Sequence, residues 1–263
     1  MDNIKYCKLC DTEDANQSNS HVVSKFLGIE ILGDKQKRTG FSHTSKTVPR
    51  PVQDLPKEDF IYCENCEKKF GSVETIIASA LKKNTTTQFN RNYDRIADDK
   101  IMPISISNRE ILIFVYINFF RLHNSKLRGL AEFKLEPSIY SRIKLTLNDC
   151  LATKLSTTKK LINECVFDFI PVTIVTPHPS ADPTKSFFSA YITTEHKTGM
   201  IICGNWILYI YQNKSVKEDN RIKSYMYRID EKNNFFQFVN TSDWISILRI
   251  LTGNITNKYN FKT

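Results

Sequence analysis

The sequence predicts an α+β fold in which a small cysteine-bearing module precedes a helical segment and a mainly antiparallel β region. Three observations support this prediction. Two Cys-x2-Cys pairs, Cys7/Cys10 and Cys63/Cys66, lie near the start of the chain. Apolar residues then recur at helical spacing as far as about residue 165. Beyond that point, short runs of β-branched and aromatic residues alternate with turn residues.

Each Cys-x2-Cys pair has the spacing of metal ligands, because a tight turn after the first cysteine brings both sulfurs within bonding distance of one ion. Two such pairs predict a four-cysteine zinc site formed by Cys7, Cys10, Cys63 and Cys66. A tetrahedral site of four thiolates has no open coordination position. We therefore expect the zinc to be structural, and any chemistry to come from the residues around it.

The expected module spans residues 1–85. Residues 21–23 read as a short strand, and residues 24–27 read as a turn that leads toward a helix. Residues 60–62 are predicted to form a strand that runs into the second cysteine pair. A helix is predicted from Glu64 to about Lys83, where Asn84 and three threonines end the pattern, because apolar side chains recur at helical spacing at Phe70, Val73, Ile77 and Leu81.

The second expected region, residues 86–263, begins with helices and continues with strands. Helical periodicity predicts helices over residues 108–120, 136–151 and 158–164. Strand-forming runs follow at residues 167–175, 187–194, 200–211, 225–229 and 235–239, and a closing helix is expected over residues 243–251.

We expect a cytoplasmic protein with no membrane segment. The N-terminus lacks the apolar run of a signal peptide, and the longest apolar run, residues 111–117, is far too short to cross a bilayer. Structural disulfides are rare in a reducing compartment. Cys150, Cys165 and Cys203, which lie among apolar neighbours, are therefore predicted to be buried core cysteines outside any disulfide.

The net charge of +9 points toward a polyanionic partner such as nucleic acid. Residues 1–83 contain 13 basic and 12 acidic residues, so +8 of the excess lies in the rest of the chain. The module nevertheless has one basic stretch with a single acid, Asp34. This stretch either grips a nucleic-acid backbone or forms a solvated loop, and its basic residues are Lys35, Lys37, Arg38, Lys46 and Arg50.

The order of features in the module is a cysteine pair, a Ser20-His21 segment, a loop, a strand ending in the second cysteine pair, and a helix. This order resembles the zinc-bearing HNH endonucleases, whose ββα-metal core is a treble-clef-like unit. The resemblance covers roughly residues 5–83. It implies that the module is a zinc-bound treble clef and that the substrate is DNA or RNA.

The resemblance also implies roles for individual residues. His21 lies at the position of the general base that activates water, close to a divalent ion that polarises the scissile phosphate. Glu67 stands where the family has a metal-binding histidine, and a carboxylate suits Mg²⁺ or Mn²⁺. The chain departs from the family where Glu58 and Asp59 replace the usual Asn or other polar residue before the second cysteine pair. Glu74, seven residues after Glu67, lies on a similar helix face.

Two function classes follow. The first is a metal-dependent nuclease, which the resemblance places among bacterial defence-type effectors, with a regulatory protein partner as a further expectation. The alternative is a non-catalytic treble-clef zinc protein that binds nucleic acid or a partner protein. Neither a P-loop nor a nucleophile elbow is present. A carboxylate or second histidine within about 5 Å of the His21 ring would favour the nuclease.

Overall fold

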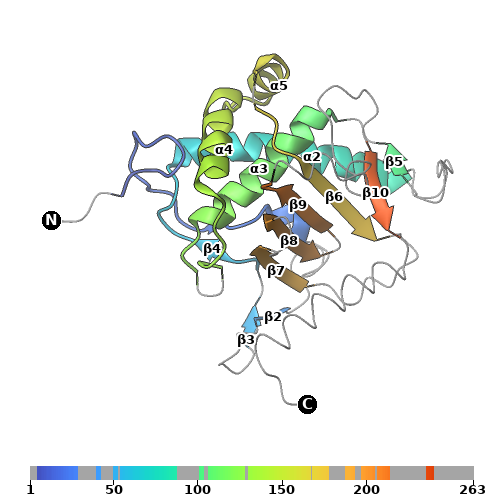
Figure 1. Cartoon of the computed structure of the whole chain (residues 1–263), viewed down its shortest axis with the longest axis horizontal. Helices are drawn as coiled ribbons and strands as arrows, with labels where there is room; N and C mark the ends of the chain where they lie inside the picture. The colour runs from blue at the N-terminus through green and yellow to red at the C-terminus, as the bar shows by residue number, and fades with distance from the viewer. Residues whose placement is uncertain are drawn as a thin grey trace.

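The structure is a computed structural model that describes residues 5–28, 40–42, 50–52, 54–87, 101–103, 106–127, 130–166, 168–177, 187–192, 197–204, 206–213 and 235–239. These residues form helices and mainly antiparallel strands (Figure 1). The predicted α+β class is confirmed at this level.

The elements of the N-terminal part are β1 (Ser20–His21), the 3-10 helix η1 (Lys25–Gly28), β2 (Gly40–Ser42), β3 (Arg50–Val52), β4 (Lys57–Glu58) and α2 (Glu64–Thr87). The remaining elements are β5 (Ile101–Pro103), α3 (Asn108–Asn124), α4 (Pro137–Cys150), α5 (Leu155–Glu164), β6 (Val172–Pro177), β7 (Phe187–Ile192), β8 (Thr198–Gly204), β9 (Trp206–Tyr211) and β10 (Phe235–Val239).

A two-stranded ribbon, β1 with β4, precedes helix α2. The strands pair antiparallel, with Ser20 opposite Glu58 and His21 opposite Lys57. The strand predicted at residues 60–62 is wrong, because the extended stretch lies earlier, at β4, and the backbone of Phe60 has a φ of 58°. A left-handed residue cannot continue a β-strand.

Helix α2 begins at Glu64, directly after Cys63, as predicted. It ends later than predicted, at Thr87 rather than near Lys83. Asn and Thr are only weakly unfavourable in a helix, at about 0.7 kcal/mol per residue or less. A run of them lowers the helix propensity of the segment without being sufficient to end the helix at Asn84.

Helix α3 is the central helix, and it lies among α2, α4, α5 and strand β9 (Figure 1). Its first turn has a capping box: Ser107 Oγ accepts from the amide of Glu110, and Glu110 Oε2 accepts from the amide of Ser107. This pair satisfies two amides that the helix leaves open. The helix is buried on nearly its whole circumference, as its apolar sequence predicts.

In the described part of the chain, the large sheet has six strands in the order β5-β10-β6-β9-β8-β7. Strands β10 and β6 are parallel, and the other neighbours are antiparallel. The single strand predicted over residues 200–211 is two strands, because Gly204, with a φ of 62°, turns the chain between β8 and β9. The first strand starts at Val172 rather than at residue 167. Residues 225–229 and 243–251 lie outside the described residues.

One hydrophobic core runs from the cysteine module into the sheet. It includes Cys7 and Phe70 from the N-terminal part, and Phe120 and Ile210 from the later part. The division of the chain near residue 85 stays a prediction, and the described residues on its two sides share this core. None of the helices in the described part of the chain has the length and apolar character needed to span a bilayer.

Cys150 is buried in the core as predicted, but the expectation that the isolated cysteines lie outside any disulfide is wrong for two of them. Cys150, at the end of α4, and Cys165, just after α5, form a disulfide. The bond closes a short loop over residues 151–164 and joins the C-terminal ends of the two helices. The apolar neighbours of each cysteine in the sequence did not indicate that the two would be close in space. Cys203 is buried in β8, as predicted.

Candidate metal centre and the neighbouring histidine

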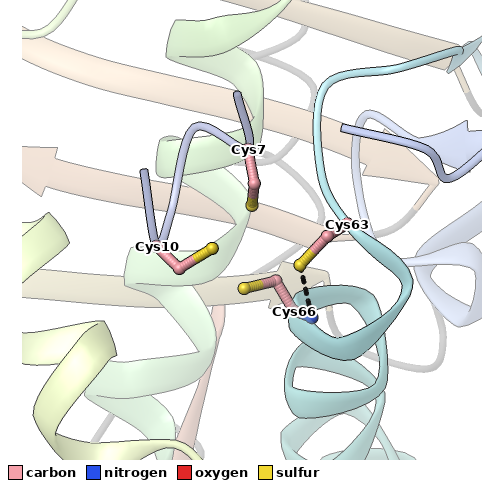
Figure 2. A group of neighbouring side chains, drawn as sticks. All are labelled: Cys7, Cys10, Cys63 and Cys66. Atoms are coloured by element: carbon pink, nitrogen blue, oxygen red, sulfur yellow. Dashed lines mark hydrogen bonds between the residues drawn. The ribbon is translucent and has the colours of Figure 1, made fainter. Parts of the chain in front are cut away.

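The first cysteine pair lies in a tight turn. The amide of Asp11 donates to the carbonyl of Cys7, with an N···O distance of 3.0 Å, and Asp11 has a φ of 58°. A left-handed residue closes such a turn, and aspartate tolerates this conformation better than most residues. The turn brings the side chains of Cys7 and Cys10 to the same side of the loop (Figure 2).

The second pair lies where the chain enters α2. Cys63 immediately precedes the helix, and Cys66 lies in its first turn. The amide of Cys66 points at Cys63 Sγ, at 3.4 Å. Backbone hydrogen bonds join the two parts of the module, from Lys8 N to the carbonyl of Ile61 at 3.0 Å and from Gln17 N to that of Tyr62 at 3.0 Å.

The four sulfurs converge, as Figure 2 shows, and all lie within 4.8 Å of one another. A tetrahedral zinc site with bonds of about 2.3 Å needs sulfurs about 3.8 Å apart. The separations between the sulfurs thus exceed those of a tetrahedral zinc site by at most about 1 Å. The four cysteines could therefore hold a metal ion such as zinc. Among the residues that the structure describes, this is the one group of three or more such ligands.

The thiols also influence each other's protonation. A hydrogen bond with Cys66 lowers the pKa of the Cys7 thiol to about 4, against the opposing effect of burial. The same hydrogen bond, together with burial, raises the pKa of Cys66, and burial raises that of Cys63 to about 12. Without a cation, burial and the neighbouring thiols therefore hold Cys63 and Cys66 in the protonated form, so the four thiols do not all ionise together. A bound cation compensates four thiolates.

The predicted site histidine, His21, lies on β1 and faces an acid. Its Nε2 is 3.1 Å from Asp54 Oδ1, and Asp54 Oδ2 is 2.6 Å from Lys57 Nζ. Lys57 is also the residue opposite His21 in the β1/β4 ribbon. All three side chains are partly exposed, by 19%, 23% and 32% respectively, so solvent reaches the group. A carboxylate within about 5 Å of the imidazole is therefore present.

The charges of this pair are set by its surroundings. Burial lowers the pKa of His21 below its usual 6.5, and this effect outweighs the hydrogen bond with Asp54, which raises it. Burial acts to raise the pKa of Asp54, but hydrogen bonds from Lys57 and His21 hold it at about 2. At neutral pH the pair is therefore a neutral imidazole beside an ionised carboxylate.

The structure does not bring Glu67 to His21. Glu67 Oε2 lies 2.7 Å from Arg121 Nη2, and Glu74 Oε1 lies 2.6 Å from Arg121 Nη1. Glu74 Oε1 also accepts from the hydroxyl of Ser24, at 2.8 Å. Arg121 is 4% exposed, so both carboxylates serve a buried cation rather than an open ligand site.

The other expected residues have separate places. Glu58 accepts from the amide of Lys126 and the hydroxyl of Ser125 at the end of α3, and Asp59 accepts from the amide of Asn19. Of the basic stretch, Arg50 lies on β3, and Lys35, Lys37, Arg38 and Lys46 lie outside the described residues.

Sequence reasoning missed Asp54, Lys57 and Arg121. Asp54 and Lys57 precede the strand predicted at residues 60–62, but no local sequence pattern connects them to His21. Arg121 had a usable signal, since it is a cation at the end of a long apolar run and a buried arginine requires acids.

No family model, no curated protein and no solved structure matches this chain.

Proposed function

We propose that this chain is a nuclease of the HNH type, in which a structural zinc ion holds a treble-clef module and His21 acts on a phosphodiester bond. The observation that carries the proposal is the His21–Asp54 pair, 3.1 Å apart. His21 lies on a two-stranded ribbon, Asp54 shortly precedes the ribbon's second strand, and the chain continues from that strand through the second cysteine pair into a helix. This is the order of parts on which the resemblance to HNH enzymes rests, and the four converging sulfurs support it.

The proposed chemistry begins with proton transfer. Asp54 accepts a hydrogen bond from Nε2–H of the neutral imidazole, which fixes the tautomer and leaves Nδ1 with its lone pair. Nδ1 takes a proton from a water molecule, and the oxygen of that water attacks the phosphorus. The bond from phosphorus to the leaving oxygen breaks, and the leaving oxygen takes a proton from solvent. Burial of His21 keeps it in the basic form at neutral pH.

The described residues do not fit the expected Mg²⁺ or Mn²⁺ site. Glu67 is paired with a buried arginine, and Asp54 is already shared by His21 and Lys57. We therefore assign no step to a divalent ion. The proposed partner is nucleic acid, DNA or RNA, and the net charge of +9 on the whole chain favours this choice.

The alternative function has one observation in its favour. Because Arg121 neutralises Glu67 and Glu74, the described part of the module lacks the carboxylate that the nuclease resemblance requires as a metal ligand. A zinc module with this arrangement serves equally well as a non-catalytic binder of nucleic acid or of a partner protein.

Cleavage assays separate the two functions. The full chain is incubated with plasmid DNA, single-stranded DNA and RNA, with Mg²⁺, with Mn²⁺ and with chelator. His21→Ala and Asp54→Asn should each lower the cleavage rate, by about 10²- to 10⁴-fold for the loss of the base. Asp168→Asn is the matched control, because Asp168 is 68% exposed and pairs with Arg142 instead. Equal cleavage by wild type and His21→Ala rejects the mechanism, and binding without cleavage under every condition favours the alternative.

A further inference from the structure

Phe60 has an unusual backbone conformation. Its φ is 58°, and its side chain is 50% exposed. A bulky residue with positive φ is a genuine outlier, and such strain costs on the order of 1–3 kcal/mol. The surrounding structure has to impose it, and an exposed ring gains little from burial in return. Strain of this kind concentrates at functional sites.

Hydrogen bonds on both sides of Phe60 impose this conformation. The amide of Phe60 donates to the carbonyl of Gln17, with an N···O distance of 2.8 Å, and the next residue, Ile61, accepts from Lys8 N at 3.0 Å. Directly before it, Asp59 Oδ1 accepts from the amide of Asn19, at 2.6 Å, and Asn19 is itself left-handed, with a φ of 56°. The conformation is therefore part of the joint between the N-terminal segment and the second cysteine pair.

The conformation changes the direction of the ring. In a continuing strand, residue 60 would lie on the same face as Glu58. The side chain of Glu58 points toward the end of α3, because its carboxylate accepts hydrogen bonds from the hydroxyl of Ser125 and the amide of Lys126. The left-handed turn interrupts this alternation, and the ring of Phe60 is half exposed instead of packed inward.

A second aromatic ring is exposed in the same module. Among the described residues, the exposed large hydrophobic side chains are Tyr6, Phe60, Leu145, Leu155 and Val166. Only Tyr6 and Phe60 are aromatic, and each lies within three residues of a cysteine of the metal group. Tyr6 is 57% exposed. The hydrogen bond from Lys8 to Ile61 holds their two segments side by side.

We propose that Phe60, together with Tyr6 on the adjoining segment, is a stacking platform for the bases of single-stranded nucleic acid next to the His21 site. This inference rests on the proposed function and names its substrate class. Phe60 follows Lys57 by three positions in the sequence, so their Cα atoms are at most about 11 Å apart. Lys57 is the residue paired with His21. The backbone of Phe60 is thus within about 11 Å of the residue paired with His21, a distance that a short oligonucleotide spans.

Single-stranded nucleic acid fits this platform better than a duplex or a protein does. Unpaired bases offer their flat faces to aromatic rings, and each stacked base is worth about 1–3 kcal/mol, whereas the bases of a duplex are already stacked. The positive net charge of the chain supplies attraction to the phosphates. A protein-binding patch would more typically present a contiguous apolar surface, whereas Phe60 and Tyr6 are the only large hydrophobic side chains exposed in the described part of the module.

The test measures binding in a His21→Ala background, so that cleavage does not interfere. The probes are a fluorescein-labelled oligothymidylate and an abasic oligomer of the same length and charge. Phe60→Ala should weaken binding of the oligothymidylate by about 5- to 150-fold and leave binding of the abasic oligomer unchanged. Phe60→Trp should retain binding. Val166→Ala, at a side chain that is 98% exposed, is the matched control.

A second variant, Phe60→Gly, distinguishes loss of the aromatic ring from misfolding. Glycine accepts a φ of 58° without strain, so this variant should unfold close to the wild-type midpoint while losing binding as Phe60→Ala does. Equal affinity of wild type and Phe60→Ala for oligothymidylate, an equal loss with the abasic oligomer, or no binding by the wild type would overturn the inference. If Phe60→Ala loses binding while the chain with His21 intact cleaves nothing, the platform stands and the nuclease proposal fails.

Discussion

Arg121 Nη2 lies 2.7 Å from Glu67 Oε2, and this ion pair joins the helix that follows the second cysteine pair to the central helix of the later region. The same guanidinium pairs with Glu74 and lies 4.8 Å above the ring centre of Phe70. Arg121 thereby fixes the orientation of α2, on whose first turn Cys66 lies. The metal group is thus attached to the hydrophobic core through a buried cation.

Removing this cation should destabilise the protein strongly. Arg121→Met leaves the largely buried carboxylates of Glu67 and Glu74 without a cationic partner, and breaking a buried ion pair in this way costs about 3–5 kcal/mol. Unfolding in denaturant, followed by circular dichroism, measures the loss. Arg142→Met is the control, since its partner Asp168 is 68% exposed and little stability should be lost there.

Glu67→Gln separates the two roles considered for Glu67. As a partner of Arg121, Glu67 should affect stability, so the variant should unfold at lower denaturant concentration while its rate of cleavage per folded molecule stays near that of wild type. As a ligand of a catalytic ion, it should affect the rate instead. A variant of normal stability without cleavage would restore the role predicted from the sequence.

The purified chain should contain one equivalent of zinc, measured by elemental analysis. Cys66→Ser should lower that content and unfold the segments around the metal, because structural zinc supplies folding free energy directly. The double variant Cys150→Ala/Cys165→Ala is the control, since it removes two cysteines outside the group and should keep its zinc. Loss of zinc in the control, or full zinc in Cys66→Ser, contradicts the four-cysteine site.

The disulfide between Cys150 and Cys165 should be detectable and stabilising. The two cysteines are 15 residues apart, and a bridge over a loop of that length contributes about 3 kcal/mol in the chain-entropy view. Alkylation in denaturant with chelator, read by mass spectrometry, should leave two of the seven cysteines unmodified until a reductant is added. Modification of all seven without reductant would contradict the bond, and would agree with the reducing compartment predicted from the sequence.

The sequence predicts best those structural features that depend on residues close together in the chain. The spacing within each cysteine pair and the apolar period of α3 are properties of neighbouring residues, and the structure contains both the four-cysteine group and the helix that they predict. The partner of His21 could be anticipated only as an unspecified acid, because Asp54 lies 33 residues away along the chain. The role of Glu67 depended on Arg121, 54 residues away, and no local pattern records that contact.

The pH dependence of cleavage should report the His21–Asp54 pair. Only the neutral imidazole accepts a proton, and burial places the pKa of His21 below 6.5, so kcat/KM should rise with pH through the acidic range and become level near neutrality. Asp54 raises this pKa and Lys57 lowers it. The acidic limb should therefore move to lower pH in Asp54→Asn, together with a lower maximum, because the imidazole loses the acid that orients it. In Lys57→Met the limb should move to higher pH. These opposite displacements are specific to a base held between the two charges. A limb that stays in place in both variants would mean that another group titrates, and His21 would then be a structural residue of the ribbon.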